Sequence, residues 1–194
     1  MGWYQKLNDY FPENEMKKKE QLEALIADHP HYKKVETKEY IVLYAEYDDF
    51  IFVDYILVDR QARGQGIGST ILEKLQQKGK TIILEVEPVV KDDPETVKRE
   101  QFYVQNGFQK AKHIRYYRDV GETSPELNQL ELYYWSPDQT TDEEEIRQAM
   151  LKVYEDIHNY QYDQFFERKT PNAKDLIRFS MQEPEHSPDE PGIE

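Results

Sequence analysis

Two runs of β-branched and aromatic residues near the middle of the chain predict a pair of strands. Residues Glu39 to Tyr47 and Phe50 to Val58 are rich in Ile, Val, Tyr and Phe, the residue types that strands favour. Only Asp48 and Asp49 separate the two runs, which predicts a hairpin. Upstream of them, the apolar residues of Glu13 to Asp28 fall on one side of a predicted helix.

After the hairpin, the pattern alternates between helices and strands. A glycine-rich stretch, Arg63 to Gly68, precedes a helix whose apolar residues recur at helical spacing. Thr81 to Val86 predicts a strand. The pair Asp93-Pro94 is typical of a helix start, with the carboxylate as cap and proline at the first helical position, and Gly107 is the expected stop of that helix. Two more strands complete the pattern, at residues 111–120 and 127–135.

A boundary near Ser136-Pro137 separates this pattern from a C-terminal segment. There Thr141 to Glu144 matches a capping box. The helix that it opens carries an apolar stripe, which would pack on the main domain or on another subunit and so support a homo-oligomer. The stripe is Ile146, Ala149, Met150, Val153 and Ile157. From Pro184 the sequence is rich in proline and acids. We expect a main domain over 1–137, a helical extension over 138–170 and an acidic, disordered tail over 171–194.

Composition and charge restrict the partners and the compartment. A chain of 194 residues suits one domain plus an extension, and the absence of cysteine excludes disulfides, thiolate metal sites and thiol nucleophiles. The five histidines show no metal-ligand spacing. A net charge of −14 disfavours nucleic acid and would attract cationic substrates such as amines. No apolar run approaches the roughly 20 residues of a membrane span, so we expect a cytoplasmic protein.

The sequence Gly64-x-Gly66-x-Gly68 before a helix is suited to binding phosphate. The first helical turn exposes N–H groups that have no partner within the helix, and their partial positive charge favours an anion. Glycines remove the Cβ atoms that would hold a ligand away. Arg63 adds a charged donor, and a hydroxyl of the first turn could add another contact. By itself, the loop also fits an ordinary glycine-containing turn.

Two other nucleotide-binding loops fit this sequence less well. A P-loop needs a lysine directly after the glycines, and none follows here. A Rossmann site needs G-x-G-x-x-G close to the strand end, whereas five residues separate Val58 from Gly64 and the spacing is different. Glu87, near the end of the next strand, could nevertheless bind a ribose. A Rossmann-type NAD-binding protein therefore stays as a remote alternative.

Three short motifs together resemble the GNAT acetyltransferases. Arg63-x-x-Gly66-x-Gly68 after a strand is similar to the coenzyme A motif of that family. Leu84-Glu85-Val86 resembles its fifth-strand segment, and Phe102-Tyr103 with Gly107-Phe108 resembles its helix end. The motifs occur in the family's order within residues 39–135. The resemblance implies an α+β GNAT-type acyl-CoA N-acyltransferase fold: a mixed central sheet flanked by helices, with a C-terminal helical extension.

The resemblance also implies acetyl-CoA as the cofactor and direct transfer of its acetyl group to an amine. The acceptor would be an amine on a small molecule, a peptide or a protein. In this family two splayed strands clamp the pantetheine, to which Val58 would contribute backbone contacts. The glycine loop and the first helical turn would bind the phosphates. These residues are Arg63, Gly64, Gln65, Gly66, Ile67, Gly68 and Ser69.

A base and an acid follow from the implied chemistry. A lysine-like amine, with a pKa of about 10.4, is almost fully protonated at pH 7, so a base is useful. By resemblance to ribosomal-protein alanine acetyltransferases, Glu85 is the first candidate. Glu87, on the same strand face, and Asp54, on the preceding strand, are alternatives. Tyr103 occupies the place of the family's acid tyrosine and would protonate the departing thiolate.

Two departures from the family pattern concern the acceptor side. The segment from Glu87 to Tyr103 is longer than in compact members and lacks the asparagine that often contacts the cofactor. The N-terminal part, where the acceptor site is usually built, shows no first strand and only one of two helices. A second hypothesis is therefore a non-catalytic, CoA-binding GNAT-fold protein with the C-terminal helix as its partner interface. The sequence does not indicate which amine is the acceptor.

Overall fold

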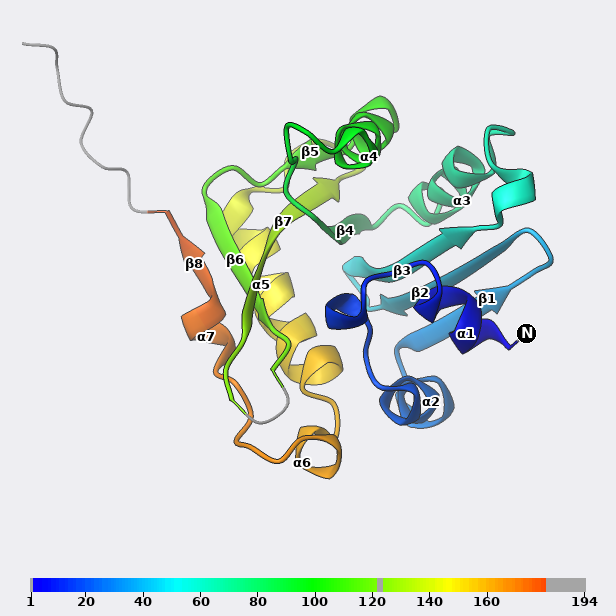
Figure 1. The fold of residues 1–194 in the computed structure, drawn as a ribbon. Helices are drawn as coiled ribbons and strands as arrows, with labels where there is room; N and C mark the ends of the chain where they lie inside the picture. Colours follow the sequence, from blue (N-terminus) through cyan, green and yellow to red (C-terminus); the bar gives the residue numbers. More distant parts are fainter. Residues whose placement is uncertain (1, 122–123, 181–194) are drawn as a thin grey trace, which may run out of the picture.

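A mixed β-sheet forms the centre of the molecule, with helices on both of its faces (Figure 1). The structure is a computed structural model that describes residues 2–121 and 124–180. The strand order is β1-β2-β3-β4-β7-β6-β8, and β5 pairs with β7. The strands are β1 (Tyr32–Glu36), β2 (Tyr40–Glu46), β3 (Phe50–Val58), β4 (Thr81–Val86), β5 (Gln109–Lys110), β6 (Ile114–Asp119), β7 (Leu127–Trp135) and β8 (Ile177–Phe179). The helices are α1 (Trp3–Asn8), α2 (Lys19–Asp28), α3 (Ile67–Gln76), α4 (Pro94–Gln105), α5 (Glu143–Val153), α6 (Tyr162–Phe165) and α7 (Ala173–Leu176).

Strands β3 and β4 run parallel and then separate. Their pairing begins at Phe50 opposite Thr81 and ends at Val53 opposite Leu84. Beyond that point β4 stays paired with β7 but not with β3. The other strand pairs of the described residues are antiparallel. This topology excludes the Rossmann alternative, because that fold is built on a mostly parallel, doubly wound sheet.

A bulge in β3 lies at the point of separation. Leu43 pairs with Tyr55, but the next residue of β2, Tyr44, pairs with Val53, so Asp54 is the extra residue on β3. A bulge bends its strand and interrupts the alternation of side chains between the two faces. As a result, both Asp54 and Tyr55 contact residues of the N-terminal segment that precedes α2.

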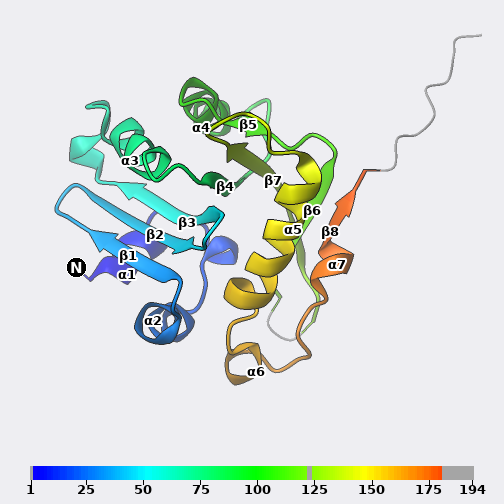
Figure 2. The same ribbon diagram turned by 180° about the vertical axis from the view of Figure 1, so that it is seen from behind.

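Two hydrophobic cores lie on opposite faces of the sheet. On one face α3 and α4 cover alternate residues of the central strands, among them Leu84 and Val86. On the other face α1, α2 and α5 cover Phe52 and Ile83. Figure 2 shows α5 lying across β6 and β7 on that second face. Because side chains alternate along β4, Glu85 projects toward the second face, between buried neighbours.

The middle of the chain folds as its sequence predicts. The hairpin of β2 and β3, the helix after the glycine loop and the strand β4 are confirmed. Asp93 caps α4, because its Oδ1 accepts the Glu95 N–H at 3.0 Å. Gly107 follows the helix with φ of 83°, the left-handed conformation that favours glycine. The mixed sheet flanked by helices confirms the predicted fold class.

The N-terminal prediction is wrong in three respects. The segment from Glu13 to Asp28 is not one helix: a 3₁₀ turn, Glu13–Glu15, is separated from α2 by extended backbone at Met16 and Lys18. That break carries Lys17 into the interior. The first helix and first strand, which the sequence pattern did not reveal, are α1 and β1. They escaped detection because α1 is short and β1 buries only Tyr32 among its polar residues.

The C-terminal segment is part of the same fold. The N-cap of α5 is Asp142 with Glu145 at the third helical position, one residue later than the predicted capping box. The stripe residues Ile146, Met150 and Val153 lie in the core on the sheet. They are therefore not available to a second copy of the chain. The region from 171 to 180, expected to belong to a disordered tail, forms α7 and β8, and β8 pairs with β6. Residues 181–194 lie outside the described part.

Within residues 2–121 and 124–180, no helix is long and apolar enough to cross a membrane. The same residues contain no group of His, Cys, Asp and Glu side chains that could hold a metal ion.

Candidate active site

The glycine loop holds the start of α3 open. Gly64 and Gly66 both have φ of 77°, and Gly66 is the N-cap residue, without a side-chain cap. A Cβ at either position would have no heavy atom within 4 Å, so the space in front of the loop is free. Gly68 has a different role: a Cβ there would lie 2.9 Å from Cζ of Phe102, so this glycine lets α3 approach α4.

The remaining loop residues lie around the same opening. The Arg63 Nε–H donates to the carbonyl oxygen of Val58 at 3.2 Å, and the guanidinium lies 4.8 Å from the centre of the Tyr10 ring. Gln65 is exposed and donates to the Gln61 carbonyl at 3.1 Å. The uncapped N–H groups of α3, the two open glycines and a nearby guanidinium fit a pyrophosphate. The structure thus brings together the residues predicted to bind the cofactor phosphates.

A narrow polar recess lies where β3 and β4 separate. Its volume is about 60 Å³, and it contains side chains from both separated strand ends, from α4, from β6 and from the segment before α2. Four carboxyl groups line it: Glu15, Asp54, Glu85 and Glu87. Its lining therefore includes all three candidate bases predicted from the sequence, together with one acid that the sequence analysis did not consider.

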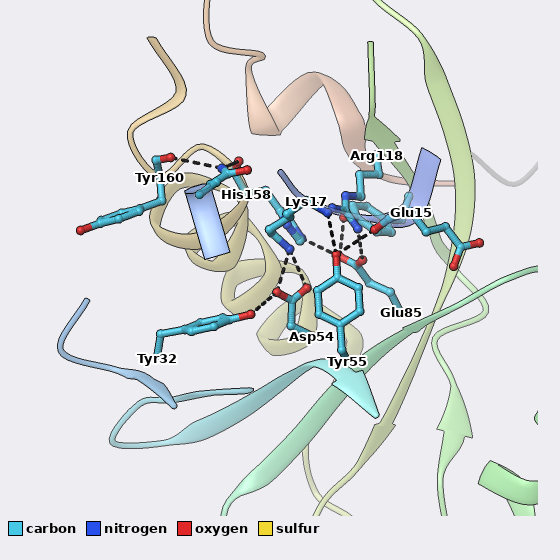
Figure 3. A network of polar contacts seen from close by, with 11 residues as sticks. Glu15, Lys17, Tyr32, Asp54, Tyr55, Glu85, Arg118, His158 and Tyr160 are labelled. Atoms are coloured by element: carbon cyan, nitrogen blue, oxygen red, sulfur yellow. Dashed lines mark hydrogen bonds and ion pairs between the residues drawn. The ribbon is translucent and has the colours of Figure 1, made fainter. Parts of the chain in front are cut away.

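Glu85 is held by three donors (Figure 3). Its Oε1 accepts the Tyr116 hydroxyl at 2.6 Å and Nε2 of His158 at 2.7 Å, and its Oε2 lies 3.6 Å from the Arg118 guanidinium. Burial alone would raise the pKa of Glu85, but His158 and Arg118, with Lys17 nearby, lower it to about 2. Glu85 is therefore a carboxylate at any physiological pH.

His158 supplies one of these contacts from an unusual turn of helix. It ends a π-helical segment, Tyr154–His158, that continues α5. Such segments are rare in proteins, and those that occur often lie at functional sites. Burial lowers the pKa of His158, so the ring is neutral and its Nε2–H donates to Glu85. Nδ1 has no hydrogen-bond partner among the described residues.

Asp54 forms a second buried ion pair beside the first. Its two oxygens accept the Lys17 ammonium at 2.6 and 2.8 Å, and Oδ2 also accepts the Tyr32 hydroxyl at 2.5 Å. The exposed fractions of the Lys17 and Asp54 side chains are 2% and 0%. Burial lowers the pKa of Lys17 to about 8, although Asp54 opposes that shift. Tyr55 links this pair to the N-terminal segment, because its hydroxyl accepts the Lys17 N–H and donates to the Glu15 carbonyl.

Glu15 and Glu87 lie together at the other side of the recess. The Arg99 guanidinium forms an ion pair with Glu87, which keeps the pKa of Glu87 below its usual value although burial opposes this. The Glu15 carboxyl lies beside that of Glu87 in the lining of the recess, where the two groups act on each other. Burial and this interaction raise the pKa of Glu15 to about 8.

Tyr103 lies outside the recess. It belongs to α4, and its ring packs near Phe108 and Tyr133 in the core on the α3 and α4 face. Its hydroxyl forms no hydrogen bond with the described residues, and burial raises its pKa to about 12. Glu85 projects to the opposite face of β4. The two predicted catalytic residues are therefore not in contact but lie on opposite faces of the sheet.

Sequence reasoning missed four residues of this site: Glu15, Lys17, Arg118 and His158. Each is far along the chain from the motifs, and only the folded chain brings it to them. Arg118 shares a face of β6 with the buried Ile114 and Tyr116, but a charged residue at such a position is not by itself a sign of burial. Lys17 is one of three consecutive lysines that read as a solvated helix start. The histidine had no spacing that would distinguish it.

Comparison with known proteins agrees with the combination of split sheet and glycine loop. Residues 24–110 match the family model of the acetyltransferase (GNAT) domain. A Bacillus subtilis (strain 168) protein that carries the name of an acetyltransferase, YjbC, is 44% identical over 184 residues, which cover 94% of this chain and 95% of that protein. This similarity places the chain in the acetyltransferases. The chain belongs to the GNAT family.

A solved structure shows the same fold. A Bacteroides thetaiotaomicron protein assigned to the GNAT acetyltransferases superposes with a TM-score of 0.67 and 22% identity, covering 81% of this chain and 88% of that one. A Bacillus subtilis acetyltransferase in complex with CoA is more distant, with a TM-score of 0.39, 13% identity and coverage of 62% and 94%. The GNAT family uses acetyl-CoA, which is therefore the cofactor of this chain.

Proposed function

We propose that this chain is an N-acetyltransferase, which transfers acetyl from acetyl-CoA to an amine. The observation that carries the proposal is the acid-lined recess at the split between β3 and β4, together with the glycine loop that follows β3 and fits a pyrophosphate. Carboxylates at the reacting end favour a cationic acceptor over a neutral alcohol. The acceptor amine would belong to a small molecule, a peptide or a protein. We also propose that the chain acts in the cytoplasm.

The residues of the glycine loop would bind the cofactor. Arg63 would pair with a phosphate, while the N–H groups from Gly64 through Ser69 would donate to the phosphate oxygens. The backbone of Val58 would bind the pantetheine. Val58 lies at the end of β3 that pairs with β2 but not with β4, so its β4 side is open. When bound, acetyl-CoA supplies an activated thioester carbonyl and a thiolate leaving group.

Tyr103 would serve as the acid. Its hydroxyl has no partner in the described chain, so it is free to donate to the departing sulfur. The raised pKa keeps this hydroxyl protonated at neutral pH. A general acid of this kind contributes typically 10²- to 10⁴-fold in rate.

Glu85 is better suited to positioning than to taking the proton. With a pKa of about 2, it would accept a proton from an amine of pKa about 10.4 at a cost of about 11 kcal/mol. Protonation would also weaken its contacts with His158, Tyr116 and Arg118. We assign to Glu85 the role of holding β4, β6 and the π-helical segment after α5 in their positions around the recess.

The test is acetyl transfer itself. Coenzyme A release should be followed with acetyl-CoA and a panel of primary amines, amino-terminal peptides and alcohols, with the product identified by mass spectrometry. We expect acetylated amines, and a fall in kcat of about 10²-fold or more for Tyr103→Phe at unchanged CoA affinity. Tyr117→Phe, at a half-buried tyrosine of β6 on the other face of the sheet, is the control. CoA binding without acetylation of any amine would contradict the proposal and favour a binding protein.

A further inference from the structure

One carboxyl group of the recess lacks an ion-pair partner among the described residues, although Arg99 and Arg118 act on it from a distance. Of the four acids that line the recess, three form an ion pair: Asp54 with Lys17, Glu85 with Arg118 and Glu87 with Arg99. Glu15 forms no ion pair with the part of the chain that the structure describes, and its carboxyl faces that of Glu87. It is half-buried at the end of a 3₁₀ turn, so a proton can pass between it and solvent.

Two carboxyl groups in contact cannot easily both be ionised. The charge of one disfavours ionisation of the other, so the pair holds on to one proton, as in other paired carboxylates. Arg99 stabilises the charge on the Glu87 side, which leaves the proton on Glu15. Burial acts in the same direction, and the pKa of Glu15 rises to about 8. Such a group matches the operating pH of a general base, which Glu85, with a pKa of about 2, does not.

We propose that Glu15, paired with Glu87, takes the proton from the acceptor amine, and that the acceptor presents a primary ammonium on a slender stem. This inference rests on the proposed acetyltransferase function and names the catalytic base and the shape of its substrate. It differs from the role expected for Glu85, which becomes a positioning residue.

The proton and electron balance of the step is simple. The N–H bond of the ammonium breaks and an O–H bond forms on a Glu15 oxygen. The freed nitrogen lone pair forms the bond to the acetyl carbon while the carbon–sulfur bond breaks. The departing sulfur receives a proton from the Tyr103 hydroxyl. The acylated nitrogen, which still carries two protons, releases one of them to solvent as the neutral amide forms, and the Tyr103 oxygen regains a proton from solvent. Glu15 then loses its proton to solvent, because its side chain is only half-buried.

The size and charge of the recess restrict the acceptor. The recess is small, with a volume of about 60 Å³, so it suits an ammonium on an unbranched chain better than a bulky amine. Because three of the four lining acids are already paired, an ionised Glu15 leaves one negative charge in excess. That charge is matched by one ammonium group. An amine on a branched carbon would need more room beside Arg118 and Leu130, so we expect it to react more slowly than its unbranched isomer.

The pH dependence of the wild-type chain and of Glu15→Gln tests this proposal. With a slender primary amine of pKa about 10.4, we expect wild-type kcat/KM to rise with pH up to about 8 and then stay level until the amine itself deprotonates. Glu15→Gln should lower kcat/KM at pH 8 by at least 10²-fold. In that variant kcat/KM should keep rising with pH up to the pKa of the amine, because only neutral amine can then react.

Two further variants complete the design. Glu87→Gln removes the neighbouring charge, so the rise should move to lower pH. Glu13→Gln changes an exposed acid of the same turn that does not line the recess, and it should behave as wild type. A Glu15→Gln profile equal to that of Glu13→Gln would overturn the proposal, as would an α-branched amine that reacts as fast as its unbranched isomer.

A second readout does not depend on turnover. The carboxyl carbon of Glu15, labelled with ¹³C and assigned by its loss in Glu15→Gln, should titrate near pH 8 in the free protein and at lower pH in Glu87→Gln. A titration near pH 4 would overturn the proposal even if the chain acetylates amines. If Glu15 titrates near pH 8 but no amine is acetylated, the proposed function is contradicted instead. The two failures are therefore distinguishable.

Discussion

At the scale of single residues, the site is defined by which carboxyl groups are paired. Asp54 and Glu85 are both buried, and each has a cation and a tyrosine hydroxyl as partners. A buried charge is tolerated only with such partners, and loss of one partner is costly. Glu85 also joins segments that are distant in sequence, since it lies on β4 and its partners lie on β6 and after α5. Its ionisation should therefore be visible in the stability of the whole chain.

The stability of the chain should fall in acid partly through Glu85. The folded pKa of Glu85, about 2, is below the value of about 4.3 expected for an unfolded chain. The difference stabilises the fold by about 3 kcal/mol at neutral pH, and this contribution is lost as the pH falls from about 4.3 to about 2. We expect Glu85→Gln to be less stable than wild type at pH 7 and to show a flatter loss of stability over that window.

Urea unfolding at a series of pH values measures this effect. The exposed acid Glu20, on α2, provides the control variant Glu20→Gln, whose curve should run parallel to that of the wild type. If the wild type and Glu85→Gln lose stability with the same slope between pH 4.3 and 2, the three contacts of Glu85 do not lower its pKa as described.

At the scale of elements, the glycine loop and the bulge of β3 are the two devices that open a site in a packed sheet. The bulge at Asp54 turns the end of β3 away from β4. The loop then returns to α3 through two glycines with positive φ. The bulge could not be predicted from the sequence, because an inserted strand residue has no marker of its own. The glycine loop was evident from the spacing of its glycines.

Substitution of Gly66 by Ala should have two effects: a loss of stability and a loss of CoA affinity. Ala in the left-handed conformation costs about 1–2 kcal/mol, and here the Cβ also enters the space in front of the α3 N-terminus. We expect Gly66→Ala to lower the free energy of unfolding by that amount and to weaken CoA binding about tenfold or more, as measured by calorimetry.

Gly79 is the matched control for this experiment. Its φ is 67°, a Cβ there would also meet nothing within 4 Å, and it lies at the other end of α3. Gly79→Ala should lose similar stability but bind CoA as well as wild type. Equal CoA affinity in both variants would mean that the loop does not bind the phosphates.

At the scale of the whole molecule, the elements that local patterns determine could be predicted and those that depend on distant contacts could not. The hairpin, α3, β4 and α4 carry clear apolar periodicity and end signals, and the motifs on them led to the family. By contrast, β1 and β8 are edge strands with few buried residues. Lys17 and His158 are buried by partners more than 30 residues away. Burial of this kind depends on the assembled fold and leaves no local pattern.

The central claim, that the chain moves acetyl from a thioester to an amine nitrogen, is tested most directly by following the acetyl carbon. Acetyl-CoA labelled with ¹³C at the carbonyl should be incubated with the chain and a slender primary amine, and the product carbon observed by NMR. We expect an amide carbonyl signal that grows as coenzyme A is released and that is lost with Tyr103→Phe. A label that stays in the thioester, or appears as an ester or free acetate, would contradict the account.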